Sequence, residues 1–128
     1  MRIDMHRTAA LVLVLVTAVA SLTACARTGT GASVRADVTA QMQAAQAPLQ
    51  QCYATALQAN RRVKGTLVVN FVAVADSGKF DHVTLGRNEP ADNGLARCVM
   101  DEVAKLKLQT PQRTAIEVAY PIRFTPNN

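Results

Sequence analysis

The chain has 128 residues and a formal charge of +5, which leaves room for one small domain. With no Trp and only five other aromatic residues, its core must consist mainly of Val, Leu, Ile and Ala. The basic residues are scattered apart from one cluster, Arg61, Arg62 and Lys64, which is either a solvated loop or a contact with anionic headgroups or cell-wall polymer.

The N-terminus has the pattern of a targeting segment. A short, net-positive start precedes the uncharged apolar residues 8–20, a run shorter than the ~20 residues that span a bilayer. Leu22-Thr23-Ala24-Cys25 follows directly and resembles the lipobox, in which small residues admit the signal peptidase. We therefore expect residues 1–24 to be a signal peptide. An ordinary secretory signal with an incidental cysteine is the alternative.

Processing at the lipobox would make Cys25 the first residue of the mature protein. Cys25 would then carry a thioether-linked diacylglycerol and an acylated amine, and each buried CH₂ contributes ~0.8 kcal/mol to membrane binding. Ala26 in place of Asp predicts the periplasmic face of the outer membrane, following the sorting pattern of enteric bacteria. This location argues against a nucleic-acid partner.

The next residues predict a tether and two helical segments. Residues 25–36 are expected to be the lipidated cysteine and a flexible tether, of which the Gly/Thr/Ser-rich part reaches only about 15 Å. The folded domain is expected at residues 37–128. Residues 34–47 favour a helix whose packing on the domain stays open, and Pro48 either interrupts it or lies in the first turn of the next helix. One apolar face then recurs at helical spacing up to Asn60, made of Leu49, Cys52, Tyr53, Ala56 and Leu57.

After Gly65 the apolar period changes to two and predicts a strand at 67–74. Both faces of this strand are mostly apolar, so we expect its second face to be covered by residues 34–47 or by a partner. A turn at Ser77-Gly78 leads to a shorter strand at 80–85, where the apolar residues fall out of step and predict a bulge.

A second amphipathic helix and a last strand complete the chain. The helix is predicted from Leu95, Cys98, Val99, Val103 and Leu106, and the strand at 115–124 alternates apolar and polar residues. These elements predict an α+β fold of order α-β-β-α-β, with two helices packed on a three-stranded antiparallel sheet. The last strand should pair with the first, giving the spatial order 2-1-3 with the most apolar strand in the centre.

The ordered set of motifs resembles the AgmX/PglI C-terminal domain, a two-cysteine relative of the TonB C-terminal domain. The resemblance covers residues 49–125 and rests on the Cys-Tyr pair of the first helix, the alternating strand after a Gly, the Gly turn, Leu-x-x-Cys in the second helix and Tyr-Pro-x-x-Phe in the last strand. The matching residues are Cys52, Tyr53, Gly65, Val69, Phe71, Gly78, Val83, Leu95, Cys98, Tyr120, Pro121 and Phe124.

This resemblance implies a disulfide between Cys52 and Cys98 that joins the two helices, and an oxidising compartment is consistent with it. Two buried free thiols are the alternative. The chain shows neither the membrane-spanning helix nor the Pro-rich spacer of TonB, so energy transduction of that type is not expected. What the resemblance does imply is recognition of a partner segment beside an edge strand, here Ile116, Val118, Tyr120, Ile122 and Phe124.

No catalytic, cofactor-binding or metal-binding constellation is expected. His82 has Asp76, Ser77 and Asp81 near it in sequence, but a hairpin turn provides no group to orient a base. We therefore expect a non-enzymatic outer-membrane lipoprotein that binds a protein of an envelope complex. The alternatives are a structural lipoprotein that uses Arg61, Arg62 and Lys64 to bind cell-wall polymer or anionic lipid, and a small inhibitor or accessory of an envelope enzyme.

Overall fold

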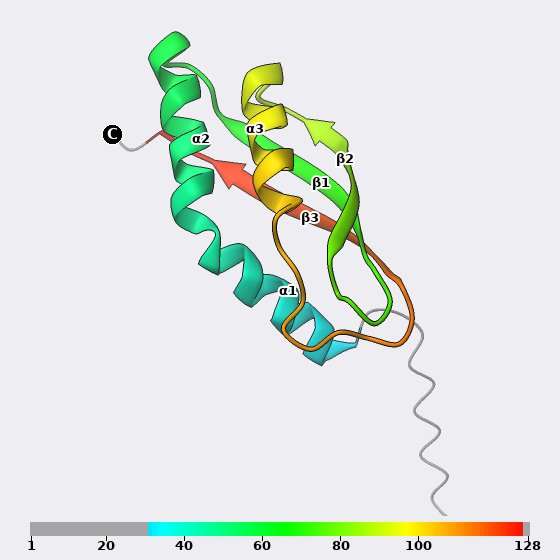
Figure 1. Ribbon diagram of the computed structural model, residues 1–128. Coiled ribbons are helices and arrows are strands. Elements are labelled where there is room, and N and C mark those ends of the chain that lie inside the picture. The colour runs from blue at the N-terminus through cyan, green and yellow to red at the C-terminus, as the bar shows by residue number, and fades with distance from the viewer. Residues whose placement is uncertain (1–30, 127–128) are drawn as a thin grey trace, which may run out of the picture.

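The computed structural model describes residues 31–126, which form three helices and one three-stranded antiparallel sheet (Figure 1). In chain order the elements are α1 (Ala32–Ala44), α2 (Gln46–Ala59), β1 (Gly65–Ala73), β2 (Phe80–Asn88), α3 (Asn93–Val103) and β3 (Ile116–Phe124). The strand order is β2-β1-β3, so the predicted α+β class and the central place of β1 are confirmed. No helix in this part of the chain is long and apolar enough to cross a membrane.

The core lies between the sheet and the helices α2 and α3, which cover the same face of the sheet (Figure 1). Side chains of β1 alternate between the two faces, and every second one, from Leu67 to Ala73, is at most 2% exposed beneath the helices. Phe71 stacks on Phe80 of β2 with ring centroids 4.3 Å apart. Two of the five aromatic residues thus pack together within a mainly aliphatic core.

Helix α1 belongs to the folded domain, and this corrects the expected boundary of the tether. Residues 32–36 are helical, because Val34 packs into the same core as Val38 and Met42 and its burial offsets the entropy lost by ordering the backbone. Pro48 lies in the first turn of α2, as one of the two alternatives predicted. It has no N–H to donate to the carbonyl of Ala44, which explains why α1 ends there.

The second face of the sheet is not covered by residues 34–47, contrary to one of our expectations. Those residues pack on the helical side instead, since Val38 and Met42 are buried in the shared core. Val68 and Val72 of β1 lie half-buried on the opposite face, between the outer strands. Within residues 31–126, this face therefore stays open.

Strand β2 is longer than predicted and irregular. Its pairing with β1 shifts register between Val68 and Val69 and again between Asn70 and Val72, which confirms the predicted bulge and adds a second one. His82 lies at one of these shifts with a φ of 50°, a conformation uncommon for a residue with a side chain.

Candidate partner-binding edge and groove

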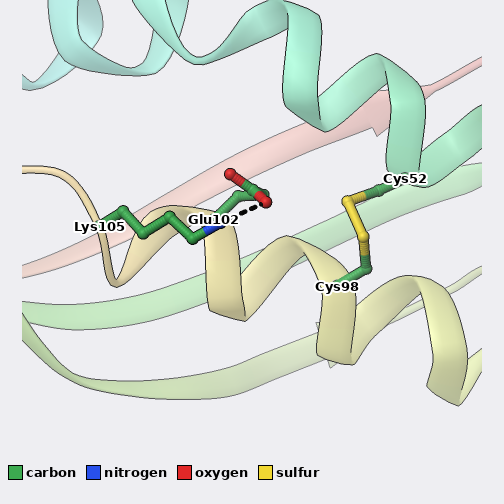
Figure 2. A network of polar contacts seen from close by, with 4 residues as sticks. All are labelled: Cys52, Cys98, Glu102 and Lys105. Atoms are coloured by element: carbon green, nitrogen blue, oxygen red, sulfur yellow. Dashed lines mark hydrogen bonds and ion pairs between the residues drawn. A yellow bond between two sulfur atoms is a disulfide. The ribbon is translucent and has the colours of Figure 1, made fainter.

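Cys52 of α2 and Cys98 of α3 form a disulfide whose Cα atoms are 5.8 Å apart (Figure 2). The pairing implied by the resemblance is thus confirmed. Figure 2 also shows the ion pair between Glu102 and Lys105 near the end of α3, at 2.7 Å. An exposed pair of this kind contributes little stability. The disulfide joins α2 covalently to α3, and both helices pack on the same core.

Tyr53, the residue after Cys52, anchors α2 over the end of β3. Its hydroxyl donates a 2.7 Å hydrogen bond to the backbone carbonyl of Val63, and its ring packs on Phe124 with centroids 4.9 Å apart. Burial raises the pKa of the Tyr53 phenol, so the hydroxyl keeps its proton and remains a donor. The disulfide and Tyr53 together hold the helix at a fixed distance from the β3 edge.

Strand β3 pairs with β1 without interruption from Ile116 to Phe124. The direction of its backbone groups follows from β1, in which Thr66 accepts from the N–H of Glu89 and Val74 donates to the carbonyl of Lys79. Even-numbered residues of β1 thus direct their backbone groups toward β2, and odd-numbered ones toward β3. Through the observed register, the even-numbered residues of β3 bond to β1 and the odd-numbered ones face outward.

The free edge of β3 therefore presents the backbone groups of Glu117, Ala119, Pro121 and Arg123. Pro121 is opposite Val68, at a position where β1 needs no N–H from it, so the proline weakens no bond of the sheet. It removes one donor from the exposed edge instead, as edge strands commonly do against aggregation. The remaining N–H and C=O groups are available to another chain.

The side chains predicted to form the partner edge face the helices rather than the solvent. Tyr120 and Ile122 are half-buried and Phe124 is 3% exposed, while Ile116 and Val118 are half-buried farther along β3. They lie at the border of the core, with no strand beyond them in the described residues. Side chains of an added strand would complete their burial.

A groove runs between this edge and the helices α1 and α2. It consists of two adjoining hollows of about 850 and 350 Å³ that share Gln50, Arg123 and Phe124. The larger one is lined by Gln50, Tyr53, Ala54, Leu57, Gln58, Arg61, Arg123, Phe124, Thr125 and Pro126. The smaller one is lined by Met42, Gln43, Gln46, Leu49, Gln50, Tyr120, Pro121, Ile122, Arg123 and Phe124.

The groove carries positive charge at one end. Of its lining residues only Arg61 and Arg123 are charged, and neither forms a salt bridge with an acidic side chain of residues 31–126. Arg123 nevertheless lies near enough to Glu89 to help lower the pKa of that carboxyl. The structure thus separates the predicted basic cluster: Arg61 lines the groove, whereas Arg62 and Lys64 are exposed and outside its lining.

The remaining predicted residues contribute no further site. His82 is exposed, and the aspartate beside it, Asp81, accepts from its backbone N–H at 2.7 Å. No group of three or more metal-ligating side chains occurs within residues 31–126. Cys25 lies outside the described residues. The sequence did not predict that α1 and Arg123 take part in the groove. They line the same groove only because α1 and α2 both run beside β3.

Searches against protein families, curated proteins and solved structures find no match for this chain.

Proposed function

We propose that this protein is a non-enzymatic, lipid-anchored envelope protein that binds an extended segment of a partner protein along the free edge of β3. The observation that carries the proposal is the coincidence of an edge strand that pairs with β1 along its whole length and a groove beside it. Strand addition requires free backbone groups for affinity and pockets for alternate side chains for specificity. The edge supplies the first, and the groove under α1 and α2 supplies the second.

The resemblance to the AgmX/PglI C-terminal domain supports the same mode of recognition. Lipidation of Cys25 is the second part of the proposal and would place the protein on the periplasmic face of the outer membrane. Since α1 begins at Ala32, only residues 26–31 would separate the lipid from the first helix. At about 5–6 Å × √n for a flexible chain, six residues reach roughly 14 Å, so the domain would stay close to its membrane.

Photocrosslinking in cells tests the binding mode. A photoreactive amino acid replaces Ala119, whose backbone groups face outward on β3, and the matched control replaces Thr84, an exposed residue of the irregular edge strand β2. A third position, Arg62, reports on the basic loop. We expect a discrete protein adduct from position 119 and none from position 84. Adducts from position 62 alone, to glycan or lipid, would overturn the proposal.

Lipidation is tested separately by the intact mass of the membrane-purified protein. The expected mass is that of residues 25–128 plus a diacylglycerol and an N-acyl chain. A free thiol at Cys25 would overturn the anchoring and leave the edge-binding proposal standing.

A further inference from the structure

The charges of the described residues are unequally distributed along the molecule. The end where α2 stops, β1 begins and β3 finishes carries five basic residues and only two acidic ones. The basic residues are Arg61, Arg62, Lys64, Arg87 and Arg123, and the acidic ones are Glu89 and Asp92. The opposite end, with the β1–β2 turn and the N-terminal half of α1, is balanced, because it contains Arg35, Lys79, Lys107 and Arg113 beside Asp37, Asp76, Asp81 and Glu117. The groove runs from the apolar residues near Met42 to the basic end.

This polarity predicts the chemistry of a segment that fits the groove. The smaller hollow has the half-buried Tyr120 and Ile122 on its strand side and Met42, Leu49 and three glutamines on its helical side, while the larger one is lined by Arg61 and by no acidic side chain. Glu89, outside the groove lining, forms a 3.3 Å ion pair with Arg87, so its charge is already paired with that cation. A carboxylate that enters the larger hollow would meet a guanidinium without an acidic partner, and arginine binds carboxylates through two parallel hydrogen bonds.

We propose that the partner segment combines alternate apolar side chains, directed toward the half-buried Tyr120 and Ile122 beside α1 and α2, with an Asp or Glu side chain that pairs with Arg61 in the larger hollow. This rests on the proposed strand addition at β3 and goes beyond it by naming the charge of the partner and its position. Pro121 sets a further limit, because it offers a carbonyl but no N–H to the added strand. Glu117 and Ala119 can therefore offer both an N–H and a C=O to the added strand. The carboxylate–arginine pair compensates for part of the hydrogen bond that Pro121 cannot make.

The test uses the segment that crosslinks to position 119, identified by peptide mass spectrometry and then synthesised with a fluorescent label. Its affinity for the purified full-length protein in detergent is measured by fluorescence anisotropy. Replacing the acidic residue by its amide is expected to weaken binding about tenfold, the scale of a charge-assisted pair. Arg61→Gln is expected to weaken the acidic peptide similarly and to leave the amide peptide unchanged.

The matched control is Arg35→Gln, which removes the same charge from an exposed residue of α1 that does not line the groove. It should leave both affinities within about twofold, since Arg35 is exposed outside the groove lining, where salt screens its charge. A captured segment without Asp or Glu would overturn the charge assignment, as would additive effects of the two changes in the double-mutant cycle. Absence of any adduct from position 119 would instead overturn the strand addition itself, so the two failures are distinguishable.

Discussion

The two outer strands of the sheet differ in how well they could accept another strand. β2 shifts register twice along its pairing with β1, has His82 at a positive φ and leaves most of its side chains exposed. β3 pairs with β1 at every residue and alternates half-buried with exposed side chains. Bulges twist an edge and interrupt its row of backbone groups. The comparison indicates that β2 is a protected edge and β3 an available one, with Pro121 as its single interruption.

The helical layer differs over the two edges as well. Helix α3 contacts β2, whereas α1 and α2 run beside β3 and leave a groove there. Apart from the backbone itself, the only covalent link between these two halves of the layer, within the described residues, is the disulfide of Cys52 and Cys98. The predictions below perturb first this link and then each edge in turn.

Removing the disulfide should have the largest effect and should fall mainly on the β3 side. For a sequence separation of 46 residues, loop closure predicts a loss of ~4 kcal/mol in unfolding free energy for Cys52→Ala/Cys98→Ala. Urea unfolding measures this loss. Hydrogen exchange should accelerate more at Val118 and Tyr120 than at Thr84, because α2 is then held over β3 by packing alone. A loss below 1 kcal/mol would show that packing already fixes the helices.

The prominence of the disulfide bears on how far the sequence could predict this structure. Apolar periodicity was sufficient for the fold class, the strand order and the helix that contains Cys98, because each of these buries one face. The disulfide itself came from the resemblance. The start of the folded domain was placed too late along the chain. Helix α1 is Ala/Gln-rich and has only three strongly buried apolar side chains, of which Val34 lies before the expected boundary.

The candidate site was less predictable than the fold. Alternation along residues 115–124 indicated an edge strand, but not which of its backbone groups are free. That required the register with β1, which the sequence does not contain. Arg61 and Arg123 are 62 positions apart, and they meet in one hollow only because α2 ends where β3 ends. The second bulge, at Gly86, was missed for a similar reason. An added Cβ at Gly86 would lie 2.7 Å from Nδ2 of Asn70 on the neighbouring strand, and the sequence does not contain this contact.

The next perturbation removes the anchor of α2 at the groove. Tyr53→Phe deletes the buried hydrogen bond to the backbone carbonyl of Val63 and should lower the unfolding free energy by about 1–2 kcal/mol. Thermal or urea unfolding measures the change. The matched control is Tyr120→Phe, also on the groove. The Tyr120 hydroxyl makes no hydrogen bond within residues 31–126, so this change should alter the unfolding free energy by close to zero. Equal losses in both variants would mean that the Tyr53 bond adds no stability of its own.

A smaller effect is expected at the free edge itself. Pro121→Val restores an outward N–H without altering the ladder to β1, and one added hydrogen bond contributes about 0.5–1.5 kcal/mol. We therefore expect tighter binding of the crosslinked segment by about tenfold at most, or concentration-dependent self-association of the free protein, measured by sedimentation. Ala119→Val is the control, because it adds a similar apolar side chain on the same face without adding a donor. If both variants behave alike, the apolar area and not the backbone donor controls association at this edge.

The smallest effect concerns the β2 edge and depends on pH. The Thr66 N–H donates to the Glu89 carboxylate at 2.7 Å, and this bond, opposed by partial desolvation and aided by Arg87 and Arg123, lowers the Glu89 pKa. Gly65, at a φ of 128°, permits the approach, since an added Cβ would lie 2.9 Å from the Glu89 Cβ. A folded-state pKa below the unfolded value stabilises the fold above the unfolded pKa, and this contribution is lost as pH falls through the folded one.

Unfolding from about pH 7 to about pH 3 should therefore show wild type and Glu89→Gln converging at acid pH. Glu117→Gln, on the β3 edge, should instead follow wild type throughout, because its carboxylate accepts no hydrogen bond within residues 31–126. A constant gap between Glu89→Gln and wild type would assign the effect to packing at Gly65, and the β2 end would then be held by shape and not by charge.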